Sequence, residues 1–377
     1  MSVSPLLKKR LRAFRRIRRA RFALWALGAI FAFCMCAELV CPCDPRAVVD
    51  PSSLEKYRRP VVEKTYDVKT ARWSVDENGN VFDYEGPKEL RGKISHGDTE
   101  TRSPTDFENE YRVTRTPRDG YVRWFLEPKA PPAEAEVVLP APEVSFPFRP
   151  VPGHPFGIDA GGRDVYARVV HGMRIALLFG LALALSGMLF GLVVGAIEGY
   201  FGGWADIALQ RFTEIWSAVP FLYVMIFIGS AVGRSFAVLL VCYAVFNWIT
   251  VSGYMRAEFL RLRRRPFVDA AKSGGISAAR IVFVHILPNA LTPLVTLFPF
   301  LLMGAIGSLA ALDFLGFGLP PMTPSCGELL QEAQQFRFAW WLVVFPASAL
   351  FVVMLLAVLV GEGLRDAFDP RRISRLE

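Results

Sequence analysis

The chain has 377 residues, of which 53% are hydrophobic and 21% charged, and its formal net charge at pH 7 is +8. Apolar stretches that contain almost no charged residue recur along it, and each is long enough to cross a bilayer. This distribution excludes an ordinary soluble domain and indicates a polytopic membrane protein.

Six of these stretches are predicted to be transmembrane helices. The first is predicted to be an uncleaved anchor and not a signal peptide, because its apolar run is long and no small-x-small cleavage site follows it. The six stretches cover residues 22–40, 176–197, 215–232, 236–253, 290–312 and 340–360.

The basic residues predict how the chain is oriented. Residues 1–21 contain nine Lys or Arg and no acidic residue, and further basic residues cluster at 256–280 and 365–375. Cytoplasmic segments of membrane proteins carry an excess of Lys and Arg. With six spans, both termini and the 256–280 loop are therefore expected in the cytoplasm, and no nucleic-acid binding is expected.

The predicted fold is an all-α membrane protein with a small β-rich periplasmic insert. Asn78-Gly79 and Asp119-Gly120, each between strand-like runs, are typical of β-hairpin turns. The proline-rich stretch 128–155 predicts an extended linker back to the membrane. The predicted parts are a basic cytoplasmic tail (1–21), a first span (22–41), the insert with its linker (42–155), a transmembrane core (156–366) and a second cytoplasmic tail (367–377).

The segment that follows the linker has two open interpretations. Val165, Val169 and Met173 lie at helical spacing after a Gly-Gly turn. They could form an amphipathic helix on the outer membrane surface, or they could extend the second span at its N-terminus. Further along, Gly199-Tyr-Phe-Gly-Gly-Trp-Ala-Asp206 predicts a tight turn on the inner side.

The run 265–289 contains a short helix with a small apolar face. Pro266 suits the first turn of a helix, and Phe267, Ala270, Ala271 and Gly274 follow at helical spacing. Gly274-Gly275 predicts a left-handed stop, and Ser277 can cap a second helix that runs to Pro288. Such a helix fits the cleft of a partner protein, but a buried helix–turn–helix without a partner fits the pattern equally well.

Several kinds of chemistry are not expected. The chain has no phosphate-binding loop, no His/Cys ligand cluster for a metal and no nucleophile elbow. The spans carry no clear mid-membrane ionisable residue, which disfavours a proton- or sodium-driven carrier. A sensor would need a cytoplasmic output domain, and no segment is left for one.

Four cysteines cluster at the end of the first predicted span. They are predicted to be packing thiols in preference to a disulfide or a metal site, and they are Cys34, Cys36, Cys41 and Cys43.

Five blocks give the chain a resemblance to the permease subunits of binding-protein-dependent peptide importers of the ABC class. The region from His154 to Arg372 resembles the dipeptide and oligopeptide branch, and three further segments and the long insert resemble its YejE-type members. The blocks are Asp269-Ala-Ala-x3-Gly275 with His285-Ile-Leu-Pro-Asn289, where Asp269 replaces the usual Glu; His154-Pro-x-Gly-x-Asp-x-x-Gly-Arg-Asp164; Gly199-Tyr-x-Gly-Gly-x-x-Asp206; Phe314-Leu-Gly-x-Gly318; and Arg365-Asp-Ala-Phe-Asp-Pro370.

The resemblance implies a six-span, type I (MetI-like) core that imports oligopeptides or peptide-like compounds; relatives of this type also take up peptide-nucleotide antibiotics such as microcin C, which the resemblance does not establish for this chain. It implies a second permease subunit in a heterodimer, two ATPase subunits or one fused ATPase that binds ATP-Mg, a periplasmic or lipoprotein substrate-binding protein, and contact with membrane lipid. The chain itself is expected to be a non-catalytic subunit of the bacterial inner membrane that binds no cofactor.

The resemblance also implies three sets of functional residues. In the coupling loop, small residues would let an ATPase approach, Asp269 would offer it an acceptor, and Leu287-Pro288 would set a bend into the fifth span. The coupling loop comprises Phe267, Asp269, Ala270, Ala271, Gly275, His285, Leu287, Pro288 and Asn289; the periplasmic segment comprises Gly157, Asp159, Gly162, Arg163 and Asp164; the outer loop comprises Asp313, Phe314, Leu315, Gly316 and Gly318.

Overall fold

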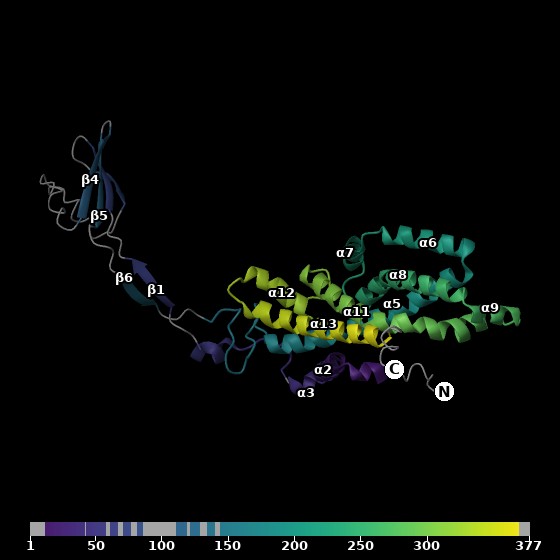
Figure 1. The fold of residues 1–377 in the computed structure, drawn as a ribbon. Helices are drawn as coiled ribbons and strands as arrows, with labels where there is room; N and C mark the ends of the chain where they lie inside the picture. The colour runs from purple at the N-terminus through teal and green to yellow at the C-terminus, as the bar shows by residue number, and fades with distance from the viewer. Residues whose placement is uncertain are drawn as a thin grey trace. The chain divides into compact units, whose positions relative to one another are not determined.

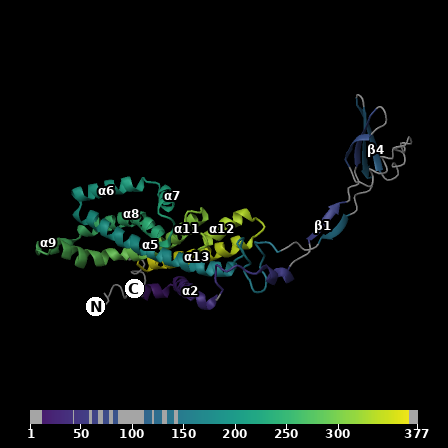
Figure 2. The same ribbon diagram turned by 180° about the vertical axis from the view of Figure 1, so that it is seen from behind.

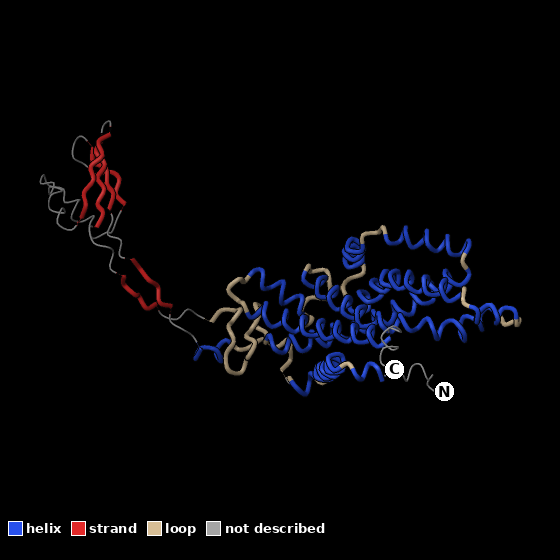
Figure 3. The backbone as a smooth tube through the Cα atoms, in the orientation of Figure 1, coloured by secondary structure: helices blue, strands red, loops and turns tan. Residues whose placement is uncertain are grey.

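The computed structural model describes residues 12–41, 43–57, 61–66, 71–76, 81–85, 111–118, 121–128, 134–139 and 144–368. The chain divides into two compact units. The first unit, Met1–Ser53 with Ser145–Glu377, holds the helices of the bundle, and the second, Leu54–Val144, holds the strands (Figures 1 and 3). Both predicted tails lie largely outside the described residues, so their placement stays a prediction.

Four long apolar helices form the bundle of the first unit and lie side by side in both views (Figures 1 and 2). Each is long and apolar enough to cross a membrane, and together they contain the predicted second, fourth, fifth and sixth spans. They are α5 (Val165–Phe201), α8 (Phe236–Arg263), the continuous helix Ala278–Phe314 that ends in α11 (Leu287–Phe314), and α13 (Trp341–Phe368).

The predicted third span is not the straight helix that its apolar pattern suggested. α6 (Gly203–Ser217) and α7 (Phe221–Ala231) meet at an angle of 69°. Pro220 directly precedes α7 with extended backbone (ψ of 108°) and supplies no N–H, so the helical hydrogen-bond pattern is interrupted there. The pair forms a fifth crossing only if it counts as one broken span.

The predicted first span is a helix with a break. α2 (Arg18–Met35) ends at Cys36, and α3 (Ala37–Val40) follows. α2 begins with three arginines, packs on α13 through Ala20 and Gly363, and places Arg19 Nη2 3.3 Å from Asp366 Oδ2. Only four to five helices of the described chain are long and apolar enough to span, so six spans remain a prediction.

α5 and α8 pack closely along a row of glycines. A Cβ atom added at Gly191 would lie 2.5 Å from Val251 Cβ, and one added at Gly195 would lie 2.5 Å from the Ser252 carbonyl oxygen. Small residues at every fourth position let two membrane helices approach to backbone contact. The sequence analysis missed this row, which is Gly187, Gly191, Gly195 and Gly199.

The second unit consists of antiparallel strands. One sheet has the order β3-β2-β5-β4, and β1 pairs with β6 in a separate two-stranded ribbon. Strands flank both predicted turns, although residues 78–79 and 119–120 lie outside the described part. The strands are β1 (Val61–Tyr66), β2 (Ala71–Asp76), β3 (Val81–Glu85), β4 (Tyr111–Arg118), β5 (Tyr121–Pro128) and β6 (Glu134–Leu139).

The prediction of an extended linker over 128–155 is wrong in part. β6 lies inside this stretch and pairs with β1, from Val61 opposite Leu139 to Tyr66 opposite Glu134. The prolines flank β6 and leave its six residues free to donate to the ladder. Whether the strands form an independent domain stays a prediction. A 3-10 helix, η1 (Pro51–Tyr57), precedes them.

Candidate functional site

The predicted coupling helix is present as α9 (Pro266–Ser273), which projects at one end of the helical bundle (Figures 1 and 2). Pro266 stands at its first position, as predicted. Of the two glycines that end it, only Gly275 is left-handed, with φ of +72°. The N–H of Gly275 donates to the Lys272 carbonyl at 3.0 Å, and that of Ile276 donates to Ala271 at 3.1 Å, so the last turn is closed.

α9 is anchored by one face and exposed on the other. Val268 and Ala271 are buried in a cluster with Phe259 of α8 and Ile281. Phe267 is 41% exposed, and Ala270 and Gly274 on the same side are also exposed. The prediction that Ala271 belongs to the open face is wrong, because it shares the side of Val268, three residues earlier.

The charged and turn residues of α9 lie in the open. Asp269 is exposed, and its Oδ1 lies 3.8 Å from Lys272 Nζ in an exposed pair. A Cβ atom added at Gly275 would meet nothing within 4 Å. Both positions are therefore accessible to a partner.

The predicted second helix does not end at Pro288. α10 (Ala278–Arg280) passes into a π-helical turn, η3 (Ile281–Ile286), and α11 continues through Pro288. A π-turn changes the hydrogen-bond pattern and so accommodates a residue without an N–H. Leu287-Pro288 therefore follows a π-turn in a continuous helix, and the predicted end is wrong. Asn289 Nδ2 donates to the His285 carbonyl at 2.9 Å, while Ser277 makes no side-chain cap.

The predicted periplasmic segment forms a tight turn at the start of α5. Gly157 and Gly162 both have φ of +78°. Asp164 caps α5 by accepting from the Ala167 N–H at 3.0 Å, and His154 Nδ1 lies 2.5 Å from its other oxygen. Since α5 starts at Val165 and is continuous, the surface-helix interpretation is wrong and the extension of the span is confirmed.

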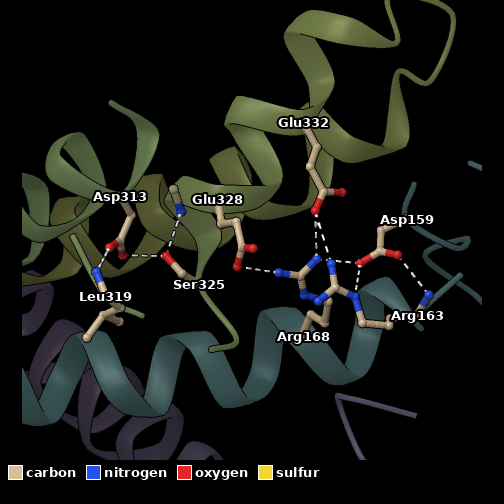
Figure 4. A network of polar contacts seen from close by, with 9 residues as sticks. Asp159, Arg163, Arg168, Asp313, Leu319, Ser325, Glu328 and Glu332 are labelled. Carbon is tan, nitrogen blue, oxygen red and sulfur yellow. Dashed lines mark hydrogen bonds and ion pairs between the residues drawn. The ribbon is translucent and has the colours of Figure 1, made fainter. Parts of the chain in front are cut away.

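Arg168 is the centre of a buried ion network at this end (Figure 4). It is 1% exposed and contacts Asp159 through Nη1. Its Nη2 donates to Glu328 at 2.6 Å and its Nη1 to Glu332 at 3.0 Å. Arg163 donates to Asp159 at 3.0 Å through Nε and to Glu332 at 3.3 Å. Both acidic partners on α12 (Cys326–Gln335) come from more than 150 residues away in the chain.

The sequence analysis found Asp159 and Arg163 but missed the other three members. Arg168 is an arginine inside an apolar helical pattern, and Glu328 and Glu332 are four residues apart on one helix face. Both features can be seen in the sequence, but no local pattern shows that the arginine pairs with the two glutamates. The set has three acids and two arginines, so one negative charge is in excess.

Burial affects two titratable groups on α12. It raises the pKa of Glu332 above its ordinary value, with Arg168 opposing the shift, and Glu332 Oε2 is buried without a hydrogen bond from any described residue. Burial also raises the pKa of the Cys326 thiol to about 12. The structure supports a packing role for Cys326, which is free.

The predicted outer loop is organised by Asp313. Its Oδ1 accepts from the Leu319 N–H at 2.7 Å, and its Oδ2 accepts from Ser325 Oγ at 2.5 Å (Figure 4). Gly318 has no room for a side chain, because an added Cβ atom would lie 1.8 Å from Asp313 Oδ1. Gly316 turns the chain with φ of +77°, whereas Phe314 and Leu315 are exposed.

The residues of the three predicted sets are thus brought to two places. α9 and its glycines lie at one end of the bundle, and the start of α5 and α12 lie at the other (Figure 1). Among the described residues, no group of three or more His, Cys, Asp or Glu could hold a metal ion. The fold and the sites define a multi-pass membrane subunit with an exposed helix that is anchored on a long span.

Comparison with known proteins identifies the class. Residues 187–374 match the family described as the inner membrane component of binding-protein-dependent transport systems. The inner membrane ABC transporter permease protein YejE of Escherichia coli is 33% identical over 378 residues, and the alignment covers 98% of each chain. The chain therefore belongs to this family of membrane permeases and is similar to its YejE members.

Other relatives match over a shorter part. The peptidoglycan transport system permease protein YejE of Agrobacterium fabrum is 45% identical over 219 residues, and the match covers 58% of each chain, so it spans less than two thirds of that relative. The dipeptide transport system permease protein DppC of Alkalihalophilus pseudofirmus is 36% identical over 59% of this chain and 73% of its own. A chain of the inward-facing MetNI methionine ABC transporter aligns with a TM-score of 0.41 and 18% identity, over 56% of this chain and 96% of that one.

Proposed function

We propose that this chain is the permease subunit of an ATP-driven, binding-protein-dependent importer for oligopeptides or peptide-like compounds. Its six-span, type I (MetI-like) core forms half of the translocation path. α9 couples that path to an ATPase on a separate chain. The observation that carries the proposal is that α9 is buried on one face, which packs on the bundle, and exposed on the opposite face.

The geometry of α9 favours a helix that binds a partner protein, in preference to a buried helix–turn–helix without a partner. Phe267 offers an apolar contact, Ala270 and Gly275 leave space for close approach, and Asp269 offers an acceptor. Val268 and Ala271 tie the helix to α8 and η3. A force on the open face is therefore passed to two long spans, as a rigid element between two sites requires.

The substrate class rests on the names of the relatives, which include peptidoglycan and dipeptide transport. We place a substrate-binding protein, periplasmic or lipid-anchored, at the α12 end, where it delivers peptide-containing compounds. The partner set includes a second permease subunit in a heterodimer, two ATPase subunits or one fused ATPase with ATP-Mg, and membrane lipid. The chain binds no cofactor and no nucleic acid.

The proposed orientation follows from the basic segments. Both termini and α9 face the cytoplasm, and the unit Leu54–Val144 lies in the periplasm. This arrangement puts α9 where a cytoplasmic ATPase can reach it, in the bacterial inner membrane.

The test is a bulky substitution at Gly275 with a control of the same backbone strain. Gly275→Trp is expected to leave the protein in the membrane while peptide uptake and co-purification of the ATPase are lost, because the side chain fills the docking space. Gly233→Trp is the matched control, since Gly233 also has a positive φ (+87°) and open space around it but lies between α7 and α8. Uptake and ATPase co-purification at the level of the control would contradict the proposal.

A further inference from the structure

The turn between α5 and α6 is held by two arginines of α8. The turn passes through Gly202 and Gly203, which have φ of +63° and +57°. Arg263 Nη1 donates to the Tyr200 carbonyl at 2.8 Å and to the Phe201 carbonyl at 3.2 Å. The second arginine, Arg256, reaches a side chain of α6 instead.

Arg256 makes a bidentate pair with Asp206. Its Nε donates to Oδ1 at 2.5 Å, and its Nη2 donates to Oδ2 at 2.8 Å. Both groups are partly buried, with side-chain exposures of 31% and 16%. Bidentate arginine–carboxylate pairs have a fixed geometry, so this contact holds the start of α6 against α8, while Trp216 Nε1 donates to the Val245 carbonyl at 3.2 Å near the other end of α6.

A second carboxylate close to Arg256 lacks a full set of partners. Glu198 of α5 is completely buried, and its Oε2 accepts from Ser252 Oγ at 3.3 Å. Its carboxyl also interacts with the Gln210 side chain, but Oε1 receives no hydrogen bond of normal geometry from any residue that the structure describes. Glu198 and Arg256 are near enough for their charges to interact. A buried polar atom without a partner is costly and calls for an explanation.

The helices that carry these three charges are unequally fixed. α5 and α8 are locked together by the glycine row, which ends at Gly199, beside Phe259. α6 leaves the bundle after the Gly202-Gly203 turn and exposes large apolar side chains such as Trp204 and Ile207. A change of partner at Arg256 therefore displaces the start of α6 relative to the α5–α8 pair.

We propose that Arg256 is a two-position switch between Asp206 of α6 and Glu198 of α5. In the described state it holds α6 and leaves Glu198 Oε1 without a hydrogen bond; in the second state it pairs with Glu198 and releases α6. The Nε–Nη2 edge of Arg256 that holds Asp206 can make a bidentate pair with only one carboxylate at a time, which makes the two arrangements alternatives. The inference deepens the proposed function, on which it rests, because α8 ends at Arg263 and α9 begins at Pro266, only a short stretch of chain after Arg256.

The switch predicts opposite effects for two neutral substitutions. Asp206→Asn removes the present partner, so Arg256 moves to Glu198 and the α6–α8 distance acquires a second population. Glu198→Gln removes the alternative partner, so the distance distribution narrows to the single described arrangement. A structural role for the cluster would instead make both substitutions lower stability without giving Asp206→Asn a second distance that Glu198→Gln lacks.

The distances are measured by pulsed electron paramagnetic resonance on the full transporter complex. Spin labels are placed at Trp204→Cys of α6 and Tyr254→Cys of α8, two exposed positions, after the exposed Cys36 and Cys43 are changed to Ser. Asp206→Glu, which keeps the charge, is the control and is expected to retain the single distance. Measurements without nucleotide and with ATP then show whether the unsubstituted complex populates both distances.

Each outcome decides the inference. A second distance in Asp206→Asn together with a single distance in Glu198→Gln supports the switch, and so does an ATP-dependent second distance in the unsubstituted complex that Glu198→Gln abolishes. Identical distributions in the two variants, or a second distance in Glu198→Gln alone, overturn it. Because the distances do not depend on ATPase docking, a second distance in Asp206→Asn together with a failed Gly275 test would leave the switch standing and remove the proposed coupling role of α9.

Discussion

Arg168 shows how a single buried cation can join two parts of a membrane subunit that are far apart in the chain. Its guanidinium contacts Asp159 before α5 and two glutamates on α12. Removing one partner of a buried ion pair costs about 3–5 kcal/mol, because the other charge is left uncompensated. We expect the α12 end of the bundle to depend on Arg168 more than on any one of its acids.

Glu332 carries the pH dependence of this network. A carboxyl whose folded pKa is raised stabilises the fold while it is protonated. That contribution is complete below the pKa of the unfolded chain, about 4.3, and is lost as the pH rises through the raised folded value. Glu332→Gln is therefore expected to raise the melting temperature relative to the unsubstituted protein more at pH 7.5 than at pH 4.5. The melting temperatures are measured on purified protein, with Glu38→Gln as an exposed control. A difference that is constant or falls with pH would refute this assignment.

Cys326 is expected to be chemically silent in the folded protein. Its pKa of about 12 leaves almost no thiolate at neutral pH, and the thiolate is the reactive form. Maleimide labelling followed by mass spectrometry should modify the exposed Cys36 and Cys43 and leave Cys326 unmodified until the protein is unfolded. Labelling of Cys326 at the rate of Cys36 would show that α12 opens readily.

At the level of elements, the structure depends on how closely α5 approaches α8. Each glycine of the row lacks a side chain, so the backbones of the two helices come into direct contact there. The two helices therefore behave as one rigid unit. The end near α12 carries Arg168, and the opposite end carries Arg256 and leads toward α9. The two candidate sites are thus connected by one rigid pair of helices.

Gly191→Leu is expected to split this pair. The new side chain has no room, since even a Cβ atom would lie 2.5 Å from Val251 Cβ, and overpacking of this kind costs about 1–3 kcal/mol or more. The melting temperature of the purified protein should fall clearly. Gly253→Leu on α8 is the matched control, because nothing lies within 4 Å of its added Cβ, and it should change the melting temperature little.

Local signals in the sequence predicted most elements, and distant pairings were missed. The Pro266 start, the Gly275 stop and the strands beside Asn78-Gly79 are set within a few residues, and all three were predicted. The acids that pair with Arg168, and the angle between α6 and α7, depend on packing across the fold. A hydropathy window also cannot distinguish a straight span from a bent pair of the same length, which is why the 69° bend in the third predicted span was not foreseen.

For the whole molecule, the strand unit is expected to be separable from the helical unit. Its β1–β6 ribbon brings Val61 opposite Leu139, so the chain enters and leaves the unit at neighbouring points. Insertions of this kind are tolerated because the ends of the host chain stay close. Replacing residues 62–138 with a short Gly-Ser linker is expected to leave membrane insertion and the melting temperature of the helical unit unchanged. A variant that fails to insert, while the same linker placed between β4 and β5 is tolerated, would show that the helices need the strands.

Because β1 and β6 are paired, their ribbon also offers a site for inserting a reporter protein. A fluorescent or enzymatic module that can be assayed on only one side of a bilayer could replace the chain between Tyr66 and Glu134, which are paired at the far end of the ribbon, without stretching either strand. Its signal would then report which compartment receives the insert. A reporter held by the hydrogen-bonded β1–β6 ribbon would thereby give a direct experimental readout of the membrane topology of the protein.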